Sequence, residues 1–329
     1  MYRLPDFRAG KPGFYPDQAI YAEYACAHFG LGFAEHDAGT GLLFSVTAPP
    51  RTLSFGAGRG SFYPQNNATA ATLANDKYLA NAVLARAGIA SLGGRYFFLH
   101  ARHRALRPPG HERADALAYL AALGGRAFVK PLLGSRGDFA QMIESEAALS
   151  DYLDAVSRYY DSVLIQPLAR GHEYRIFVID DEILYCARKY PPALLGDGVR
   201  SIDELLTQHD LALRARGLSP AAIAPNGHDV VLASGARWEI PGRMNLSIGG
   251  TMALEAPEPE QEACAIARAS VRALGLRLGA VDIFVEPGPD QIRVIEVNSN
   301  PSIRFLEDCG RDDLILAIWR HTFTAMGLL

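Results

Sequence analysis

The amino-acid sequence predicts a mixed α/β protein of the α+β kind, built from more than one lobe. Its 329 residues correspond to about two domains, or to one large α/β enzyme. Hydrophobic residues make up 49% and charged residues 21%, which is enough apolar material for a sizeable core. Short apolar runs alternate with segments of helical spacing, and two hairpin patterns later in the chain indicate antiparallel strands.

Charge and cysteine usage argue against several classes of protein. The chain carries 32 Lys and Arg against 36 Asp and Glu, a net charge of -4, whereas nucleic-acid binders are usually basic. No apolar run approaches the roughly 20 residues that cross a membrane, and the first residues lack the apolar stretch of a signal peptide. The four cysteines form no CxxC pair and are Cys26, Cys186, Cys264 and Cys309. We therefore expect a cytoplasmic protein with reduced thiols and with neither nucleic-acid nor membrane partners.

The first 70 residues predict a small α/β unit. A helix is expected over Asp17–His28, ended by Gly30 in a left-handed turn, and a strand over Leu42–Val46. The glycine-rich segment 56–64 lacks both GxGxxG and GxxxxGK[ST]. We therefore interpret it as a connection between elements and not as a phosphate loop.

A helix over Asp76–Ala87, closed by Gly88, leads into a compact lobe over about 90–168. The pattern of this lobe is strand, helix, strand, helix, strand. The expected elements are Arg95–His100, Arg113–Leu123, Ala127–Pro131, Glu146–Tyr160 and Val163–Pro167.

The rest of the chain begins with a hairpin pattern, in which the apolar runs Glu173–Asp180 and Glu182–Lys189 meet at Asp180-Asp181. Ser201-Ile-Asp-Glu204 is a capping box, which predicts the start of a helix. Turn residues 287–290 separate two further strands. The later elements expected are strands over 229–232 and 237–240, a helix over 260–274, strands over 280–286 and 292–297, and a helix over 312–326.

Acidic and amide side chains in the two last strands predict a metal site. Glu296 and Asn298 are two residues apart, so they project from the same face of their strand. Asp282 lies in the preceding strand between Val281 and Ile283, and antiparallel pairing would bring it to the same cluster. Carboxylate and amide oxygens are the ligands that Mg²⁺ prefers, together with phosphates and water. The alternative is a polar strand end that faces solvent.

Cations spread over the chain could complete a polyphosphate site. Lys130 follows an apolar strand, from which it can reach a phosphate as a point charge. Lys77 sits in the first turn of a helix, where a basic residue is unfavourable to the helix dipole, and this hints at another role. Each cation taken alone is more often a solvated surface charge. The remaining candidates are Arg175, Arg188, Lys189 and Arg243.

A short loop directly after Lys130 is bounded by Gly134 and Gly137. Such a loop can lay its backbone N–H groups over phosphates. Taken alone the signal is weak, and it gains weight from the neighbouring lysine.

The order of these motifs resembles the ATP-grasp superfamily of carboxylate–amine ligases. Within it, the sequence is most similar to the ATP-grasp part of cyanophycin synthetase and to the ribosomal-protein glutamate ligases. The resemblance covers about residues 70–305. The motifs that carry it, in order, are Asn75-Asp-Lys77, Val129-Lys-Pro131, Gln166-Pro167, Gly171-His-Glu-Tyr-Arg175, Gly196-Asp-Gly198, Asn245-Leu-Ser-Ile-Gly-Gly250, Asp282 and Glu296-Val-Asn-Ser-Asn-Pro301.

The resemblance implies a role for each group of residues around ATP and one or two Mg²⁺ ions, with Mn²⁺ as an alternative ion. The metal ligands would be Asp282, Glu296 and Asn298. The nucleotide would be held by the hinge strand 164–168 with Gln166 and Leu168, by Glu173 at the ribose, and at the phosphates by Lys77, Lys130, Gly134, Ser135 and Gly137. The γ-phosphate and the acyl phosphate would be steadied by Arg175, Arg188 and Arg243. The carboxylate substrate would contact Asn245, Ser247, Gly249 and Asn300.

The resemblance also implies an ATP-grasp fold, in which two lobes with antiparallel sheets enclose ATP. The expected domains are an N-terminal α/β domain over 1–73, a central lobe over 74–168 and a C-terminal lobe over 169–329. A carboxylate would attack the γ-phosphate, and an amine would then displace phosphate from the acyl phosphate. The products would be an amide or peptide bond, ADP and phosphate, and the substrate an amino acid or small peptide.

Other functions stay open at this stage. The same fold serves peptide maturases and kinases that phosphorylate a hydroxyl, and a non-catalytic nucleotide-binding protein is a further alternative. A Rossmann dehydrogenase is disfavoured, because no GxGxxG follows an early strand. The chain lacks the Mur-ligase-like domain of cyanophycin synthetase, so we do not expect it to make that polymer by alternating sites. A homodimer or homotetramer is possible on family precedent.

Overall fold

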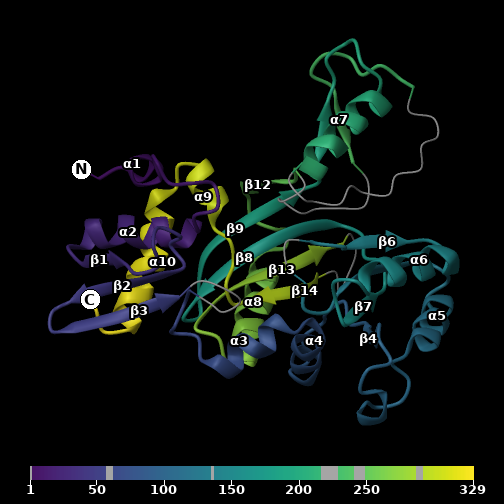
Figure 1. The fold of residues 1–329 in the computed structure, drawn as a ribbon, viewed down its shortest axis with the longest axis horizontal. Coiled ribbons are helices and arrows are strands. Elements are labelled where there is room, and N and C mark those ends of the chain that lie inside the picture. The colour runs from purple at the N-terminus through teal and green to yellow at the C-terminus, as the bar shows by residue number, and fades with distance from the viewer. Residues whose placement is uncertain (1, 57–61, 135–136, 216–228, 241–248, 287–291) are drawn as a thin grey trace.

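The computed structural model describes residues 2–56, 62–134, 137–215, 229–240, 249–286 and 292–329. Figure 1 shows three packed units and a fourth that projects from them. The mixed α/β class with antiparallel sheets is confirmed, since every strand pair in the named sheets is antiparallel. None of the described helices combines the length and the apolar character needed to cross a membrane.

The N-terminal unit joins the first 63 residues to helices from the far end of the chain. Its sheet has the order β1-β2-β3. Helix α10 lies beside α2 and this sheet in Figure 1, and it buries Ile315, Ile318, Trp319 and Phe323 in their common core. The elements are α1 (Leu4–Arg8), α2 (Asp17–Phe29), β1 (Gly32–Glu35), β2 (Leu43–Ala48), β3 (Arg51–Gly56), α9 (Arg304–Asp308) and α10 (Asp312–Ala325).

A four-stranded sheet with the order β4-β7-β5-β6 forms the second unit. Helices α5 and α6 cover it, and their apolar faces share one core with the strands. Because β7 lies between β4 and β5, its backbone is paired on both edges. The elements are β4 (Arg95–Phe98), η1 (Arg104–Leu106), α5 (Arg113–Ala122), β5 (Ala127–Pro131), β6 (Gln141–Ile143), α6 (Glu146–Val156) and β7 (Ser162–Gln166).

A five-stranded sheet with the order β12-β9-β8-β13-β14 forms the third unit. Helices α3, α4 and α8 cover one face of it through a core of small and branched apolar residues. The elements are α3 (Ala68–Asn75), α4 (Lys77–Arg86), β8 (His172–Ile179), β9 (Glu182–Tyr190), β12 (Thr251–Leu254), α8 (Glu260–Leu274), β13 (Leu278–Val285) and β14 (Ile292–Asn298). The other face packs partly against the N-terminal unit, through Phe177, Tyr185 and Ala280. The rest of this face lies near Lys130 of β5, and the candidate site forms there.

A small unit projects from the chain between β9 and β12, at the upper right of Figure 1. It has its own apolar core, which includes Leu194, Leu205 and Ile240. Its elements are β10 (Ala193–Leu195), α7 (Ile202–Ala215) and β11 (Arg237–Glu239). The predicted capping box is confirmed, since Ser201 Oγ accepts from the backbone N–H of Glu204 at 3.2 Å, and the Glu204 carboxylate accepts from the N–H of Ser201 at 2.8 Å.

Most predicted elements are confirmed, some with shifted ends. Helix α2 ends at Gly30, which has a φ of 72° as a left-handed cap requires. Helix α6 stops at Val156, short of the predicted Tyr160. The predicted strand 229–232 is wrong, because this segment contributes only an isolated bridge between Val231 and Ser201. Residues 57–61 of segment 56–64 and the whole of the turn 287–290 lie outside the described residues.

Candidate active site

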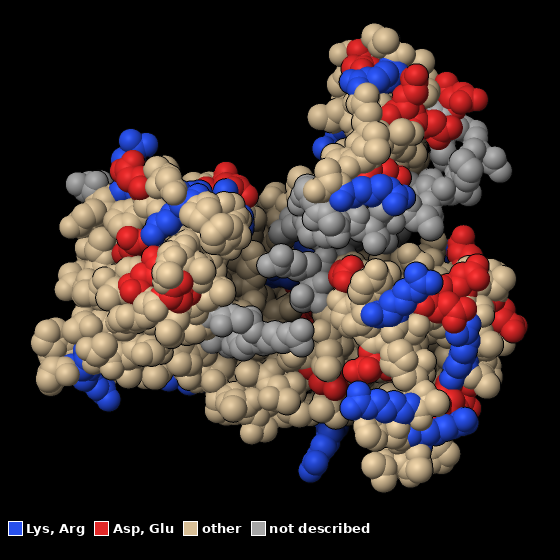
Figure 2. Space-filling view, viewed as in Figure 1, with Lys and Arg blue, Asp and Glu red and all other residues tan. Residues whose placement is uncertain are grey.

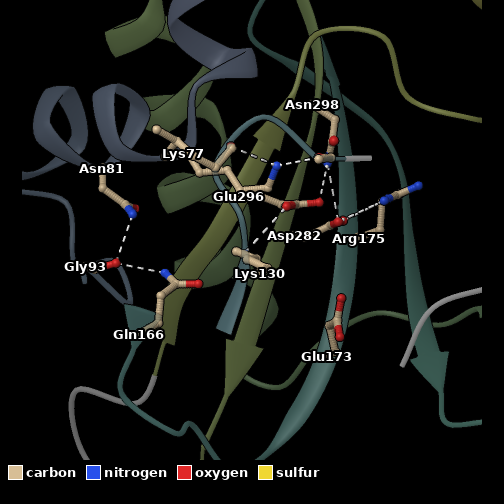
Figure 3. A network of polar contacts seen from close by, with 12 residues as sticks. Lys77, Asn81, Gly93, Lys130, Gln166, Glu173, Arg175, Asp282, Glu296 and Asn298 are labelled. Carbon is tan, nitrogen blue, oxygen red and sulfur yellow. Dashed lines mark hydrogen bonds and ion pairs between the residues drawn. The ribbon is translucent and has the colours of Figure 1, made fainter. Parts of the chain in front are cut away.

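The candidate site stands on three neighbouring strands of the five-stranded sheet. Asp282 on β13 lies opposite Arg175 on β8 and opposite Glu296 on β14. Residues directly opposite each other project from the same face, so the three side chains converge, as Figure 3 shows. The pairing of β13 with β14 shifts between Asp282 and Ile283, and such a bulge re-aims the side chains beside it.

Asp282 is the central anion of the cluster and its side chain is only 1% exposed. Its carboxylate accepts two hydrogen bonds from Arg175, each 2.8 Å long, and one from Lys189 at 2.8 Å. Burial would raise the pKa of Asp282, but Arg175 and Lys189 outweigh it and hold the pKa well below its usual range. A carboxylate this buried is stable as an anion because two cations contact it.

Lys189 is one of the candidate cations of the hairpin, but the family resemblance assigned it no role. It is buried, and its ammonium group contacts both the Asp282 and the Glu173 carboxylates. Burial favours the neutral amine, yet Asp282 and Glu173 raise the pKa of Lys189 above its ordinary value. Glu173, predicted to hold a ribose, is therefore already paired with a lysine in this structure.

Arg188 does not join the cluster, contrary to the prediction. It precedes Lys189 on β9, and successive side chains of a strand point to opposite faces. Its guanidinium donates to Glu255 Oε1 at 3.0 Å and lies 2.9 Å from His172 Nδ1, away from Asp282.

Two lysines approach the cluster from the neighbouring elements. Lys130, at the end of β5, is buried, and its Nζ lies 3.8 Å from Glu296 Oε2. Burial lowers the pKa of Lys130, and Glu296 opposes that change. Lys77, in the first turn of α4, donates to the Gly134 carbonyl at 2.7 Å and so connects the helix to the glycine loop (Figure 3).

Glu296 and Asn298 offer the most accessible oxygens of the predicted metal ligands. The Glu296 side chain is 28% exposed. Burial would raise the pKa of Glu296, but Lys130 and Lys77 lower it, so the group is an anion. Asn298 Nδ2 lies 3.3 Å from Asp282 Oδ2 and 3.4 Å from Glu296 Oε1. This set of carboxylate and amide oxygens fits Mg²⁺. In this structure Asp282 instead holds two cations, and its role as a metal ligand stays a prediction.

Part of the segment predicted to pair with adenine, 164–168, is already hydrogen-bonded within the sheet. Leu164 and Ile165 already pair with β5 and β4, so their backbones are occupied within the sheet. The segment after Gln166, with Leu168 37% exposed, is where backbone groups of this hinge could face a base. Gln166 is buried and donates to the Gly93 carbonyl at 2.8 Å, while its Oε1 has no hydrogen-bond partner among the described residues.

Several predicted site residues cannot be placed. Ser135, Arg243, Asn245 and Ser247 lie outside the described residues. Gly249 lies by the projecting unit, where an added Cβ would meet Pro192 at 3.6 Å. Asn300 Oδ1 accepts from the backbone N–H of Phe62 at 3.4 Å, on the side of the N-terminal unit.

The predicted loop glycines have separate structural reasons to be glycine. A Cβ on Gly134 would lie 2.9 Å from the Cβ of Pro131, and Gly137 has a φ of 68°. Figure 2 shows the molecule hollowed between the N-terminal unit on the left and the projecting unit at the upper right.

Comparisons with known proteins agree with this architecture. No family model matches the chain. It is 26% identical over 261 residues to cyanophycin synthetase from Geminocystis herdmanii, a match that covers 70% of this chain and 28% of that protein. It is 24% identical over 252 residues to the glutathione biosynthesis bifunctional protein GshAB from Desulfotalea psychrophila, covering 69% of this chain and 31% of that protein.

Among solved structures, the chain is similar to D-alanine–D-alanine ligase from Bacillus anthracis. The TM-score is 0.52 at 16% identity, and the match covers 78% of this chain and 69% of that one. The chain therefore has the fold of the ATP-grasp ligases. In sequence it is similar to ADP-forming carboxylate–amine ligases of that class, cyanophycin synthetase among them. It spans about a third or less of the length of cyanophycin synthetase and of GshAB.

Proposed function

We propose that this protein is an ATP-dependent carboxylate–amine ligase. It would form an amide or peptide bond through an acyl phosphate and release ADP and phosphate. The observation that carries the proposal is the meeting of Lys130 and Lys77 with Glu296 and Asn298, across the junction of the four-stranded and five-stranded sheets. Fixed cations beside a metal-type donor set are what phosphoryl transfer requires.

In this proposal Glu296 and Asn298 would hold Mg²⁺, which when bound neutralises charge on phosphate oxygens. Lys130 would bind a phosphate oxygen, for which its partly desolvated ammonium lies in place near Glu296. Arg175 and Lys189 would keep Asp282 ionised and fix the sheet face on which the metal ligands stand. We also propose Asp282 as a further ligand and Mn²⁺ as an ion that can replace Mg²⁺.

We also propose the units that carry the function. We propose the domains 1–73, 74–168 and 169–329, with three helices reassigned according to the cores in which they pack. Helices α9 and α10 belong with the N-terminal unit, and α4 packs against α8 and β14. An amino acid or small peptide is the proposed substrate, and the cytoplasm the proposed location, in keeping with four free cysteines.

The test is ADP release from Mg²⁺-ATP over a matrix of amino acids and dipeptides, with hydroxylamine present to trap an acyl phosphate. We expect ADP and a hydroxamate to form together with at least one carboxylate. The Glu296→Gln variant should fold like the wild type and release no ADP, because it loses a metal-ligand charge.

Two results would contradict this proposal. ADP released without hydroxamate, with phosphate recovered on a hydroxyl of the acceptor, would identify a kinase. ATP bound tightly by the wild type with no turnover of any member of the matrix would favour a non-catalytic nucleotide-binding protein. In either case the ATP-grasp fold stands.

A further inference from the structure

A second cluster of metal-ligating side chains lies on the opposite face of the five-stranded sheet, away from Glu296. Cys186 on β9 points toward the helix-covered face, and Cys264 and Glu260 come from α8. Glu260 and Cys264 are four residues apart, so they stand one turn apart on the same helix face. Among the described residues this is the one group of three or more Cys, His, Asp or Glu whose ligand atoms all lie within 4.8 Å of one another.

The spacing of the ligand atoms matches that of a tetrahedral thiolate site. The two sulfur atoms are 3.8 Å apart, and the three ligand atoms all lie within 4.8 Å of one another. Zinc bound to thiolates at about 2.3 Å in tetrahedral geometry requires sulfur atoms about 3.8 Å apart. The thiols therefore need little rearrangement to share one ion.

An ion bound here would be covered by protein on the cysteine side and would face solvent on the Glu260 side. Cys264 is 6% exposed and Cys186 is partly buried, whereas Glu260 is exposed at the start of α8. Two thiolates and one carboxylate exceed the charge of a divalent cation by one. Burial and the neighbouring Cys264 raise the pKa of the Cys186 thiol to about 12, and Arg268, one turn beyond Cys264, opposes this rise. Binding of the ion would therefore release a proton from Cys186.

We propose that Cys186, Cys264 and Glu260 bind a thiophilic divalent cation of the Zn²⁺ class, with a fourth position open to water. The ion would join α8 to β9. Strand β9 carries Lys189 on its other face, where Lys189 pairs with Glu173 and Asp282. A metal ion at this site would therefore stabilise the position of the strand that carries Lys189. The proposal does not depend on ligase activity, and its test uses none.

The test uses the full-length protein, reduced and freed of metal by a chelator. Cd²⁺ is added as the probe, because cadmium–thiolate bonds give a charge-transfer absorption that carboxylate sites do not. We expect this absorption to saturate at one equivalent and Zn²⁺ to displace the Cd²⁺. The exposed Cys309 provides a matched control, and Cys309→Ser should behave like the wild type.

Two variants test the ligands. Cys186→Ser combined with Cys264→Ser should abolish the absorption. Glu260→Gln changes an exposed residue and should leave the fold intact, so it keeps the proposal testable if the serine variant unfolds. Outer-shell partners are worth roughly 10- to 100-fold in metal affinity, so loss of this direct ligand should weaken Zn²⁺ binding by at least about tenfold.

Three results would overturn the proposal. The first is an absence of thiolate absorption in the wild-type protein. The second is Zn²⁺ affinity that Glu260→Gln and the serine variant leave unchanged. The third is a Cys186–Cys264 disulfide in the protein isolated without reductant, combined with no metal binding after reduction.

Discussion

Arg188 and Lys189 are neighbours in the chain, yet they serve opposite faces of one strand. Lys189 is 8% exposed and contacts two carboxylates, whereas Arg188 pairs with Glu255 at the rim. Alternate residues of a strand share a face, and a shift of one residue in the pairing register moves every side chain to the opposite face. The sequence therefore predicted that a cation of this hairpin serves the site, and the register decides which one.

Replacement of Lys189 by methionine should destabilise the protein strongly. The change leaves Glu173 without its cation and removes one of two from Asp282, both in buried positions. Breaking a buried ion pair on one side costs about 3–5 kcal/mol, and we expect a loss near 3 kcal/mol because Arg175 remains. Urea denaturation followed by circular dichroism measures the change in the free energy of unfolding.

Two further variants control this experiment. Lys189→Met combined with Glu173→Gln should recover part of the loss, because the unpaired charge is removed. Lys11→Met, which breaks a partly exposed pair with Glu23 and a cation–π contact with the Tyr15 ring, should cost about 1 kcal/mol. Equal effects of Lys189→Met and Lys11→Met would contradict a structural role for the buried pair.

At Lys130 the expected effect is on nucleotide binding. Lys130→Met keeps the buried aliphatic stem and removes the charge beside Glu296. A hydrogen bond to a charged group is worth about 1.5–3 kcal/mol, so we expect the dissociation constant for ATP to rise roughly 10- to 100-fold. Isothermal titration calorimetry with Mg²⁺-ATP measures it, with Lys11→Met as the matched control. An unchanged affinity would remove Lys130 from the proposed phosphate site.

Among the elements, the start of β8 depends on one glycine. Gly171 has a φ of 119°, and a Cβ there would lie 2.2 Å from the backbone carbonyl oxygen of Val285 on β13. Backbone atoms of two paired strands cannot move apart cheaply, so the position combines left-handed geometry with a close approach. This glycine lets β8 enter the sheet next to the strand that carries Asp282.

Gly171→Ala should therefore cost more than about 2 kcal/mol in the free energy of unfolding. Gly88→Ala is the matched control. Gly88 has a φ of 72° with nothing within 4 Å of the added Cβ, so its substitution should cost only about 1 kcal/mol. Equal losses in urea denaturation would show that the contact with Val285 relaxes easily.

Sequence reasoning found the long elements and missed several short ones for a common reason. Helix α8 and the β13–β14 pair have enough residues for their periodicity to be visible. The missed strands β6 and β10 have three residues each, and β12 has four, which is too few for an alternation pattern, although β11 was predicted over 237–240. Their pairing depends on partners supplied by the tertiary fold, so the local sequence carries little of the signal.

At the scale of the whole molecule, Asp180 connects three elements from distant parts of the chain. It lies in the β8–β9 turn and accepts hydrogen bonds from Arg277, before β13, and pairs with His321 in α10. The hydrogen bonds from Arg277 outweigh partial burial, His321 adds to them, and together they lower the pKa of Asp180 to about 2.

A lowered pKa in the folded state means that ionised Asp180 stabilises the protein above its unfolded pKa of about 3.9. That contribution is lost as the pH falls toward the folded pKa of about 2. Asp180→Asn should lower the melting temperature at neutral pH. The loss in the free energy of unfolding should be less than about 1 kcal/mol, because the Asp180 side chain is half exposed. Thermal melts of both proteins across this range test the sign. The difference should shrink below pH ~4, and a constant difference would contradict it.

The site as a whole is assembled from segments that no local pattern connects. Lys77 and Lys130 precede Glu296 by more than 150 residues, and the ordered motifs predicted their meeting through resemblance to a known fold. The partner of α10 was not predictable, because an apolar helix face does not specify which sheet it covers. Its docking on the N-terminal sheet is a property of the tertiary fold.

That docking has a consequence for the order in which the protein can be made. A ribosome releases α2 and β1–β3 long before it has synthesised α10, which fills their core with Trp319 and Phe323. During that interval the sheet presents Phe44 and Phe55 without the helix that buries them. The first segment of the chain therefore completes its folding last. Until then its exposed aromatic side chains form an apolar surface of the kind that chaperones bind.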